Sequence, residues 1–157
     1  MEIKGCEKPI YSIDLTKATR GDSPVLIPLL ERIDGNIGDV CGDKGEASRR
    51  NAQYIANRGG TPFLMMKNNS TGKSKGFPAW REMHVSKKKD EKAWDKRYHK
   101  RSNNEAGFGS FKQQTNSYLS SRKRKCQNNE VWLKTISYNI RQLIHRLVRL
   151  DVARGEL

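Results

Sequence analysis

The sequence predicts an α/β fold in which short strands alternate with helices and a long amphipathic helix follows near the C-terminus. Three observations predict it: runs of β-forming residues, helix-start signals after these runs, and apolar residues that recur every three or four positions toward the end. The predicted strands are residues 10–15, 37–43 and 61–66. This alternation indicates a largely parallel region, and functional residues gather at the carboxyl ends of such strands.

Two helices are predicted between these strands. The first has Asp22 or Ser23 as its cap and Pro24 near its first position, where the missing N–H of proline costs nothing. The second runs from a cap at Ser48 to Arg58, where a pair of glycines ends it. The strand between the two helices ends at an acidic residue, in the position where active residues are expected.

Residues 67–91 are predicted to form a basic loop region. Residues 67–76 are polar, cationic and turn-prone, which indicates a flexible loop able to touch phosphates. A helix is predicted from about residue 92 onward. Trp80 and Trp94 lie among lysines, so DNA contact stays open for them, although tryptophans are more often core anchors.

The last helix has the clearest pattern in the chain. Its apolar residues recur at spacings of three and four: Leu133, Ile136, Ile140, Leu143, Ile144 and Leu147. We interpret this stripe as a core face rather than a binding surface. The core is expected to be modest, because only 34% of the 157 residues are apolar and 31% are charged.

The positive charge is concentrated in the second part of the chain. The net charge is +14, and residues 1–60 hold nine basic and nine acidic side chains, whereas residues 61–157 hold twenty-two and eight. One-sided positive charge is typical of proteins that bind a polyanion, because lysine and arginine release counterions from a phosphate backbone. Nucleic acid is therefore the leading partner class. The alternative is a solvated basic face that aids solubility.

The cysteines and the N-terminus indicate a protein of the reducing cytoplasm. Cys6, Cys41 and Cys126 are odd in number and show no short spacing, so neither a disulfide framework nor a zinc knuckle is supported. The N-terminus has no apolar signal region, and the longest apolar stretch, residues 25–30, is far too short to span a membrane. We expect a soluble intracellular protein without a membrane partner or a small-molecule substrate.

One segment combines a carboxylate with several cations. On a regular helix, Tyr98, Arg101, Glu105 and Lys112 lie at offsets of 0, 3, 7 and 14 and project from one face. A carboxylate flanked by a guanidinium and an ammonium suits a phosphate-handling site, in which the acid holds a metal ion and the cations steer DNA. The alternative is an exposed ion pair between Arg101 and Glu105, worth a few tenths of a kcal/mol.

This spacing resembles the Y-x2-R-x3-E-x6-K signature of DDE-type insertion-sequence transposases. Four further segments resemble the same family: residues 19–23, residues 40–45 with their Asp-Lys-Gly turn, residues 49–51 and residues 59–62. The resemblance spans roughly residues 10–145 and identifies the chain as similar to the C-terminal part of the catalytic domain. It implies one partial domain over residues 1–157, with its core at about 8–66 and 92–150.

The resemblance implies a fold and a chemistry. The fold would be a ribonuclease H-like mixed sheet with flanking helices, and two Mg²⁺ ions would activate an oxygen for attack on DNA phosphodiesters. Asp43 matches the second catalytic carboxylate and Glu105 the third, both as metal ligands. Arg101 and Lys112 would contact DNA phosphates, and Tyr98 would support them. The partner would be DNA at transposon ends, the location a prokaryotic nucleoid, and a homodimer stays open.

The sequence departs from the family pattern at two places. The first aspartate belongs on an opening strand upstream of residues 10–15, and Asp14 and Asp22 lie too near Asp43 to replace it. Asp14 is interpreted as a strand residue and Asp22 as a helix cap. Glu46 stands where the family prefers tyrosine, which is expected to disturb packing. We therefore expect the N-terminal strands to be missing.

Two other functions remain open at this point. A non-catalytic basic DNA-binding protein derived from a transposase would keep the phosphate contacts without the chemistry. A basic RNA-binding protein would explain the charge but not the spacing of the four signature residues.

The departure at the first aspartate predicts little or no strand transfer by this chain alone, because a two-metal site would lose its bridging ligand. Purified protein would be incubated with labelled duplex DNA and Mg²⁺ or Mn²⁺. Robust cleavage that Glu105→Ala abolishes would contradict this expectation.

Overall fold

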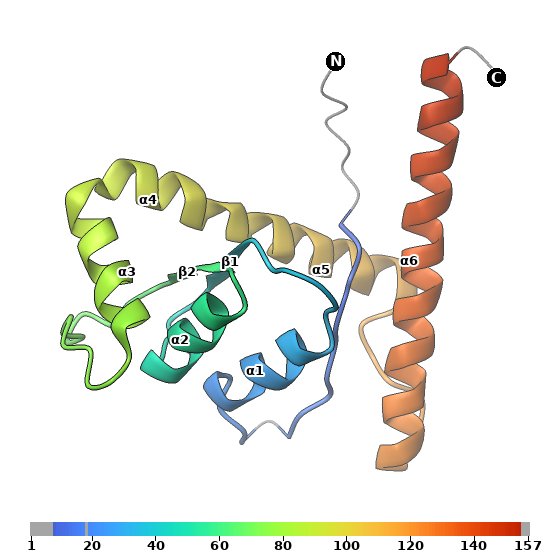
Figure 1. The fold of residues 1–157 in the computed structure, drawn as a ribbon. Coiled ribbons are helices and arrows are strands. Elements are labelled where there is room, and N and C mark those ends of the chain that lie inside the picture. The colour runs from blue at the N-terminus through green and yellow to red at the C-terminus, as the bar shows by residue number, and fades with distance from the viewer. Residues whose placement is uncertain (1–7, 18, 155–157) are drawn as a thin grey trace. The chain divides into compact units, whose positions relative to one another are not determined.

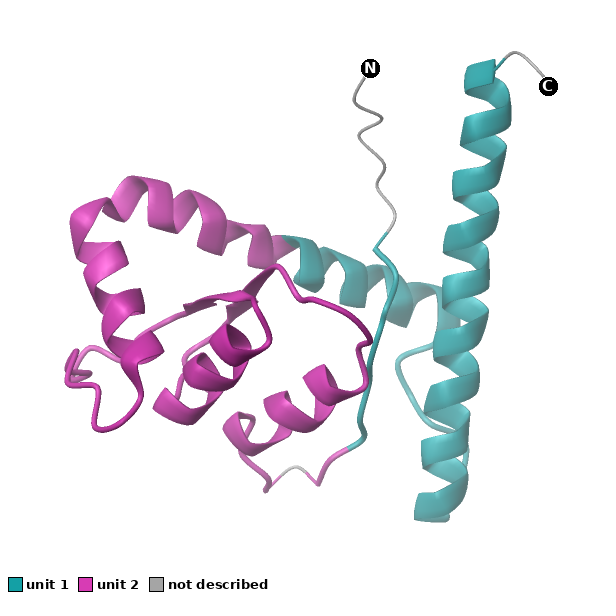
Figure 2. Cartoon of the chain, viewed as in Figure 1, with its two compact units in different colours: residues 1–15, 103–157 teal, residues 16–102 magenta. Residues whose placement is uncertain are grey.

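The computed structural model describes residues 8–17 and 19–154, and the chain divides into two compact units. Unit 1 combines residues 1–15 with residues 103–157, and unit 2 comprises residues 16–102 (Figure 2). Among the described residues, no helix is both long and apolar enough to cross a membrane.

Unit 2 is built on a pair of parallel strands joined by a helix (Figure 1). Its elements are α1 (Ser23–Glu31), β1 (Asp39–Gly42), α2 (Arg49–Asn57), β2 (Thr61–Leu64), α3 (Pro78–Lys89), α4 (Glu91–Tyr98) and a 3-10 turn, η1 (His99–Arg101). Asp39 lies opposite Thr61 and Gly42 opposite Leu64 in the parallel register. The two predicted strands here, the helix between them and the mixed α/β class are confirmed.

The start of α2 forms as predicted, whereas the start of α1 differs in one detail. The hydroxyl of Ser48 accepts a hydrogen bond from the backbone N–H of Asn51 at 3.1 Å, so the predicted cap is confirmed. Asp22 occupies the cap position of α1, but its side chain makes no capping hydrogen bond. Its backbone is already helical (φ −76°, ψ −33°), whereas a capping side chain needs an extended backbone to reach the helix N–H groups.

The predicted loop region contains a helix, α3, that was not expected over residues 78–89. Trp80 and Met83 are buried one turn apart on it, and the lysines of its last turn lie at the negative end of the helix dipole. Residues 67–76 are free of helix and strand, as predicted, but they are tethered. Trp80 Nε1 donates to the carbonyl of Thr71 at 2.9 Å, and Arg49 Nε donates to that of Lys73 at 2.9 Å.

The core of unit 2 lies between the strands and the helices that cover them. It comprises Leu26, Leu30, Ile37, Ala52, Ile55, Phe63, Leu64, Trp80, Met83, Trp94 and Tyr98. Trp80 and Trp94 are only 4% and 3% exposed, so their side chains are core anchors and the idea that they stack on DNA bases is wrong.

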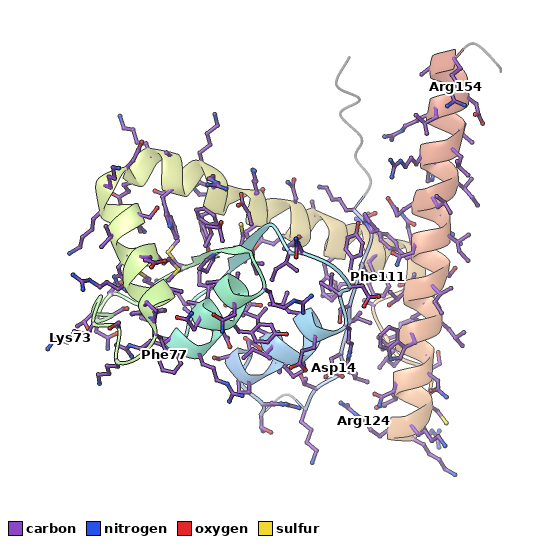
Figure 3. The ribbon with its side chains drawn as sticks, in the orientation of Figure 1. Asp14, Lys73, Phe77, Phe111, Arg124 and Arg154 are labelled. Atoms are coloured by element: carbon purple, nitrogen blue, oxygen red, sulfur yellow. The ribbon has the colours of Figure 1, made fainter. Side chains whose placement is uncertain are left out.

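Unit 1 consists of an extended N-terminal segment, most of α5 (Ser102–Thr115) and the long helix α6 (Arg124–Arg154). Phe111 of α5, labelled in Figure 3, packs edge-on against Tyr138 of α6 with ring centroids 5.6 Å apart. Tyr138 is 1% exposed and its hydroxyl donates to the carbonyl of Gly107 at 3.4 Å. These contacts join the two helices of the unit.

The predicted strand at residues 10–15 is wrong, since these residues form no strand. The backbone N–H of Ile10 donates to Oδ1 of Asn139 at 2.9 Å, and the carbonyl of Ile10 accepts from Nδ2 of the same residue at 2.8 Å. Arg124 donates to the carbonyl of Leu15 further along. Side chains of α6 thus satisfy backbone groups that a neighbouring strand would otherwise pair.

The predicted core face of α6 is also wrong, although the helix itself is confirmed. The exposed fractions of the six residues are 66% for Leu133, 53% for Ile136, 52% for Ile140, 55% for Leu143, 53% for Ile144 and 50% for Leu147. The buried residues of α6 are Thr135 and Tyr138 on its other side. Unit 1 therefore packs on a narrower, more polar face than the sequence pattern indicates.

Candidate functional site

Asp43 follows β1 directly and opens a tight turn over residues 43–46. Its Oδ1 accepts hydrogen bonds from the backbone N–H groups of Gly45 at 2.7 Å and Glu46 at 3.3 Å. In return, Oε2 of Glu46 accepts from the backbone N–H of Asp43 at 2.9 Å. Two carboxylates therefore close the turn, and Asp43 stays exposed at the carboxyl end of a parallel strand, where the sequence predicts a functional acid.

Gly45 lies where this turn approaches the start of α1. A Cβ atom at this position would be 2.9 Å from Oδ2 of Asp22 and 3.0 Å from Oδ1 of Asp43, distances that require a neighbour to move. Only glycine therefore fits between these two carboxylates without a shift. Asp22, which fails to cap α1, lies instead beside the turn.

Glu46 is an integral part of the turn through the hydrogen bond that its carboxylate accepts, and the expected disturbance of packing at this position stays a prediction. Burial raises the pKa of its carboxyl above the usual value, and the negative charges of Asp43 and Asp22 act in the same direction. The N–H of Asp43 and the positive charge of Arg101 oppose this rise in the pKa. The carboxyl is thus held in a partly desolvated place by the hydrogen bond that it accepts.

Asn51 fixes the turn to the two helices beside it. It is 2% exposed, and its Nδ2 donates to the carbonyl of Glu46 at 2.7 Å and to the carbonyl and hydroxyl of Ser23 at 2.9 and 3.2 Å. In the sequence, Asn51 follows a pair of arginines, a pattern that resembles the family. This pattern does not predict the hydrogen bonds that Asn51 makes. The role of Asn51 depends on acceptors that lie 5 and 28 residues away.

Arg101 approaches this turn from η1. Its Cζ lies 5.9 Å from the ring centroid of Tyr98, and its charge lowers the pKa of Glu46. Tyr98 is 7% exposed and stacks on Trp94 with ring centroids 5.4 Å apart. The guanidinium of Arg101 therefore lies over the ring of the buried Tyr98. The fold of unit 2 brings Arg101 near the turn that holds Asp43, although the two are far apart in the sequence.

An ion pair at the same strand was not anticipated. Arg97 of α4 binds both carboxylate oxygens of Asp39, at 2.5 and 3.0 Å, and Lys100 lies 3.6 Å from the same carboxylate. Arg97 also lies over the ring of Phe63, 4.7 Å from its centroid. These contacts attach α4 to β1. Asp39 and Arg97 are 58 residues apart, so no local pattern could pair them.

Glu105 and Lys112 lie on α5 in unit 1. Glu105 is exposed in the first turn of the helix, where the positive end of the helix dipole favours a carboxylate. Lys112 is also exposed, and its Nζ lies 4.6 Å from the ring centroid of Phe108. Phe108 in turn stacks with Phe111 at 5.9 Å, so the lysine is positioned by an aromatic pair anchored in the core of the unit.

The four signature residues do not lie on one regular α-helix. Tyr98 ends α4, Arg101 belongs to η1, and Glu105 and Lys112 lie on α5. Tyr98 and Arg101 belong to unit 2, whereas Glu105 and Lys112 belong to unit 1. That all four project from one face, and that Asp43 and Glu105 meet at one edge of the sheet, stay predictions.

Carboxylate oxygens are the hard ligands that Mg²⁺ prefers, but too few of them lie together among the described residues to form a metal site. Within residues 8–17 and 19–154, no three acidic, histidine or cysteine side chains are grouped so that they could hold a metal ion. The carboxylate of Asp43 already accepts two backbone N–H groups. The donor chemistry therefore fits magnesium, while neither unit by itself assembles a two-metal centre from the described residues.

The chain also matches a known protein family. The model of the transposase DDE domain family matches residues 3–140. The chain therefore belongs to the transposase DDE domain family. Neither the curated proteins nor the solved structures contain a match to it.

The raised pKa of Glu46 predicts a pH-dependent effect of Glu46→Gln. The folded chain holds the Glu46 proton more tightly than the unfolded chain, so protonation stabilises the fold below the unfolded pKa and this contribution is lost as pH rises through the folded pKa. Glutamine keeps an acceptor for the N–H of Asp43 without the charge. We expect the variant to have a higher free energy of unfolding than the parent at pH 7, and the difference to shrink as pH falls through the raised folded pKa and to vanish below the unfolded value of about 4.

The measurement is urea unfolding at several pH values, followed by the fluorescence of Trp80 and Trp94 in a Trp132→Phe background so that the signal reports on unit 2. Glu82→Gln, an exposed carboxyl on α3, is the matched control. A Glu46→Gln protein less stable than its parent at pH 7 would show that the charge itself is favourable there.

Proposed function

We propose that this chain acts in DNA transposition by binding the DNA backbone, with Asp43 and Glu105 as carboxylate ligands of a divalent metal. The observation that carries the proposal is the approach of Arg101 to the turn that holds Asp43 and Glu46. A guanidinium beside one exposed and one half-buried carboxylate suits a site that must hold a phosphate and a cation together. The membership of the chain in the transposase DDE domain family also supports this proposal.

In this proposal the residues come from both units. Asp43 and Arg101 belong to unit 2, and Glu105 and Lys112 belong to unit 1, so each unit offers one carboxylate and one cation. Tyr98 supports Arg101, and Phe108 supports Lys112. Bound Mg²⁺ would activate the attacking oxygen and stabilise the leaving one. The ribonuclease H-like fold is part of the proposal, with β1 and β2 as neighbouring parallel strands of its sheet.

A further contact with DNA is proposed at the tethered loop of residues 67–76. An open hollow of about 500 Å³ there is lined by Gly72, Lys73, Ser74, Lys75 and Arg81. Lys73 projects from this loop (Figure 3). Three cations around an open hollow suit a strand of phosphates, which fixes position without reading sequence.

A second candidate function is that of a DNA-binding protein without catalysis. It is favoured by the way the turn is satisfied, since Asp43 accepts two backbone N–H groups and Glu46 a third. A turn closed in this way needs no cation to hold its carboxylates in place. Both functions share salt-sensitive DNA binding, and they differ in the binding of divalent metal.

Replacing Arg101 and Lys112 by alanine is expected to weaken DNA binding. If each cation contacts a phosphate, the double variant should reduce the slope of log K against log salt by about two. Fluorescence anisotropy of a labelled duplex would be recorded between low and physiological salt. Lys96→Ala, an exposed cation on α4, is the control and should shift the slope less. A double variant with an unchanged slope would remove these two residues from the interface.

Metal binding separates the two functions. If Asp43 and Glu105 are ligands, Asp43→Asn and Glu105→Gln should each weaken Mn²⁺ binding by at least about ten-fold. The binding would be followed by electron paramagnetic resonance of free Mn²⁺, with and without duplex DNA. Asp34→Asn, an exposed aspartate of unit 2, serves as the control. Equal Mn²⁺ binding by all four proteins would favour the non-catalytic candidate.

A further inference from the structure

Four consecutive cations stand at the start of helix α6, outside the candidate site described above. Arg122, Lys123, Arg124 and Lys125 form this basic cluster, and all four are exposed. Arg124, the first residue of α6, is labelled in Figure 3. Residues 106–129 contain five cations and no acidic residue, so the surrounding sequence supplies no counter-charge for the cluster.

The fold uses only one of these four charges. Arg124 donates to the carbonyl of Leu15. The side chains of the other three make no hydrogen bond or ion pair with the residues that the structure describes. The first turn of α6 contains no acidic residue, and the positive end of a helix dipole disfavours cations there. The cluster therefore does not stabilise α6, and an anion from outside the chain would relieve its repulsion.

The residues just before the cluster are held in place by side chains of α6. The two carboxylate oxygens of Glu130 accept hydrogen bonds from the backbone N–H groups of Ser120 and Ser121, each at 2.9 Å. These two hydrogen bonds are the main reason that the pKa of Glu130 is lowered to about 2. Gln127 donates to the carbonyl of Ser121 at 3.0 Å. The backbone therefore reaches the cluster along a fixed path.

The same segment borders Lys112, the cation that unit 1 contributes to the candidate site. Lys134 of α6 forms an ion pair with Glu130 at 3.1 Å and donates to the carbonyl of Tyr118 at 2.6 Å. A hollow of about 240 Å³ is lined by Lys112 and by residues 116–119. A polyanion that reaches Lys112 can therefore continue along this segment to the basic cluster.

The chemistry of the cluster fits the phosphate backbone of duplex DNA. No aromatic or apolar residue interrupts the four cations, so they offer charge without a pocket for a base or a ring. Duplex DNA carries about one negative charge per 1.7 Å of its axis, which matches a run of adjacent cations better than a single phosphate does. Contacts of this kind fix the position of DNA and do not read its sequence.

We propose that the basic cluster binds the backbone of duplex DNA, in addition to the contacts proposed for Arg101 and Lys112, and that Glu130 positions the cluster for this contact. The proposal rests on the proposed function in one respect, because that function makes DNA the partner. The contact does not depend on DNA sequence and requires no divalent metal.

The salt dependence of DNA binding tests the cluster. The cluster variant combines Arg122→Ala, Lys123→Ala and Lys125→Ala, and it keeps Arg124 because that side chain holds the carbonyl of Leu15. Fluorescence anisotropy of a labelled duplex would be recorded at several salt concentrations without divalent metal. The slope of log K against log salt should fall by about two to three, since each phosphate contact contributes about 0.9. Circular dichroism checks that α6 stays helical.

Two matched variants separate local contact from net charge. The combination of Lys88→Ala, Lys89→Ala and Lys92→Ala removes three exposed charges from unit 2 and should lower the slope by less than about one. A charge-preserving variant with Arg122→Lys, Lys123→Arg and Lys125→Arg should bind like the parent. Equal slopes for the two triple alanine variants would overturn the proposal, because net charge alone would then explain the effect.

The same measurement distinguishes this proposal from the proposed function. A reduced slope for the cluster variant, with the parental slope for the Arg101 and Lys112 double variant, supports the cluster and removes those two residues from the interface. A reduced slope for the double variant alone overturns the cluster and leaves the proposed function standing. Vesicles that contain phosphatidylserine serve as the other polyanion. A cluster variant that loses vesicle binding but keeps the parental slope on DNA also overturns the proposal.

Glu130→Ala tests the positioning role. This variant gains one net positive charge, so electrostatics alone predicts tighter DNA binding. If Glu130 positions the cluster, the variant should instead bind duplex DNA roughly three- to ten-fold more weakly, because the loosened segment must be ordered on the DNA. Glu31→Ala, which removes an exposed glutamate of unit 2, should bind at least as tightly as the parent.

The background of the cluster variant excludes a purely structural effect. With the three cations already removed, Glu130→Ala should weaken DNA binding no further, because there is no cluster left to position. Equal weakening in both backgrounds would overturn the positioning role, and so would a Glu130→Ala chain that binds DNA more tightly than the parent.

Discussion

The buried amide of Asn51 is the interaction on which unit 2 depends. Its two hydrogens serve acceptors in the turn after β1 and at the start of α1, while its own backbone lies in the first turn of α2. Loss of the amide would leave these acceptors buried without a donor, which is costlier than the loss of an exposed hydrogen bond. The position of Asp43 therefore depends on a residue that carries no charge.

The turn beside this amide places like charges close together and compensates for them. Asp22, Asp43 and Glu46 gather around Gly45, and the raised pKa of Glu46 reflects their proximity after its burial. Backbone N–H groups and the charge of Arg101 offset the repulsion. Such an arrangement keeps a carboxylate exposed at the end of a strand, where it can meet a cation or a phosphate-bound metal.

Elements with strong local signals were predicted correctly, and those that depend on distant partners were not. The Ser48 cap, the helix start at Pro24 and the strand before Asp43 need only neighbours within a few residues. Residues 10–15 have the composition of a strand, but Asn139 satisfies the backbone of Ile10 from 129 residues away. Within the candidate site, Asp43 and Arg101 were predicted from spacing and resemblance. The hydrogen bonds of Glu46 and Asn51 were not predicted, because a hydrogen-bond network has no sequence period.

The sequence by itself determined the α/β class, the family and the identity of the charged residues, because local propensity and fixed spacing are written along the chain. Only the tertiary structure decided which apolar faces are covered. The stripe on α6 looks like a core face in sequence, yet unit 1 uses Thr135 and Tyr138 on the other side and leaves the stripe exposed. Periodicity shows that a face is apolar, and burial depends on which other element reaches it.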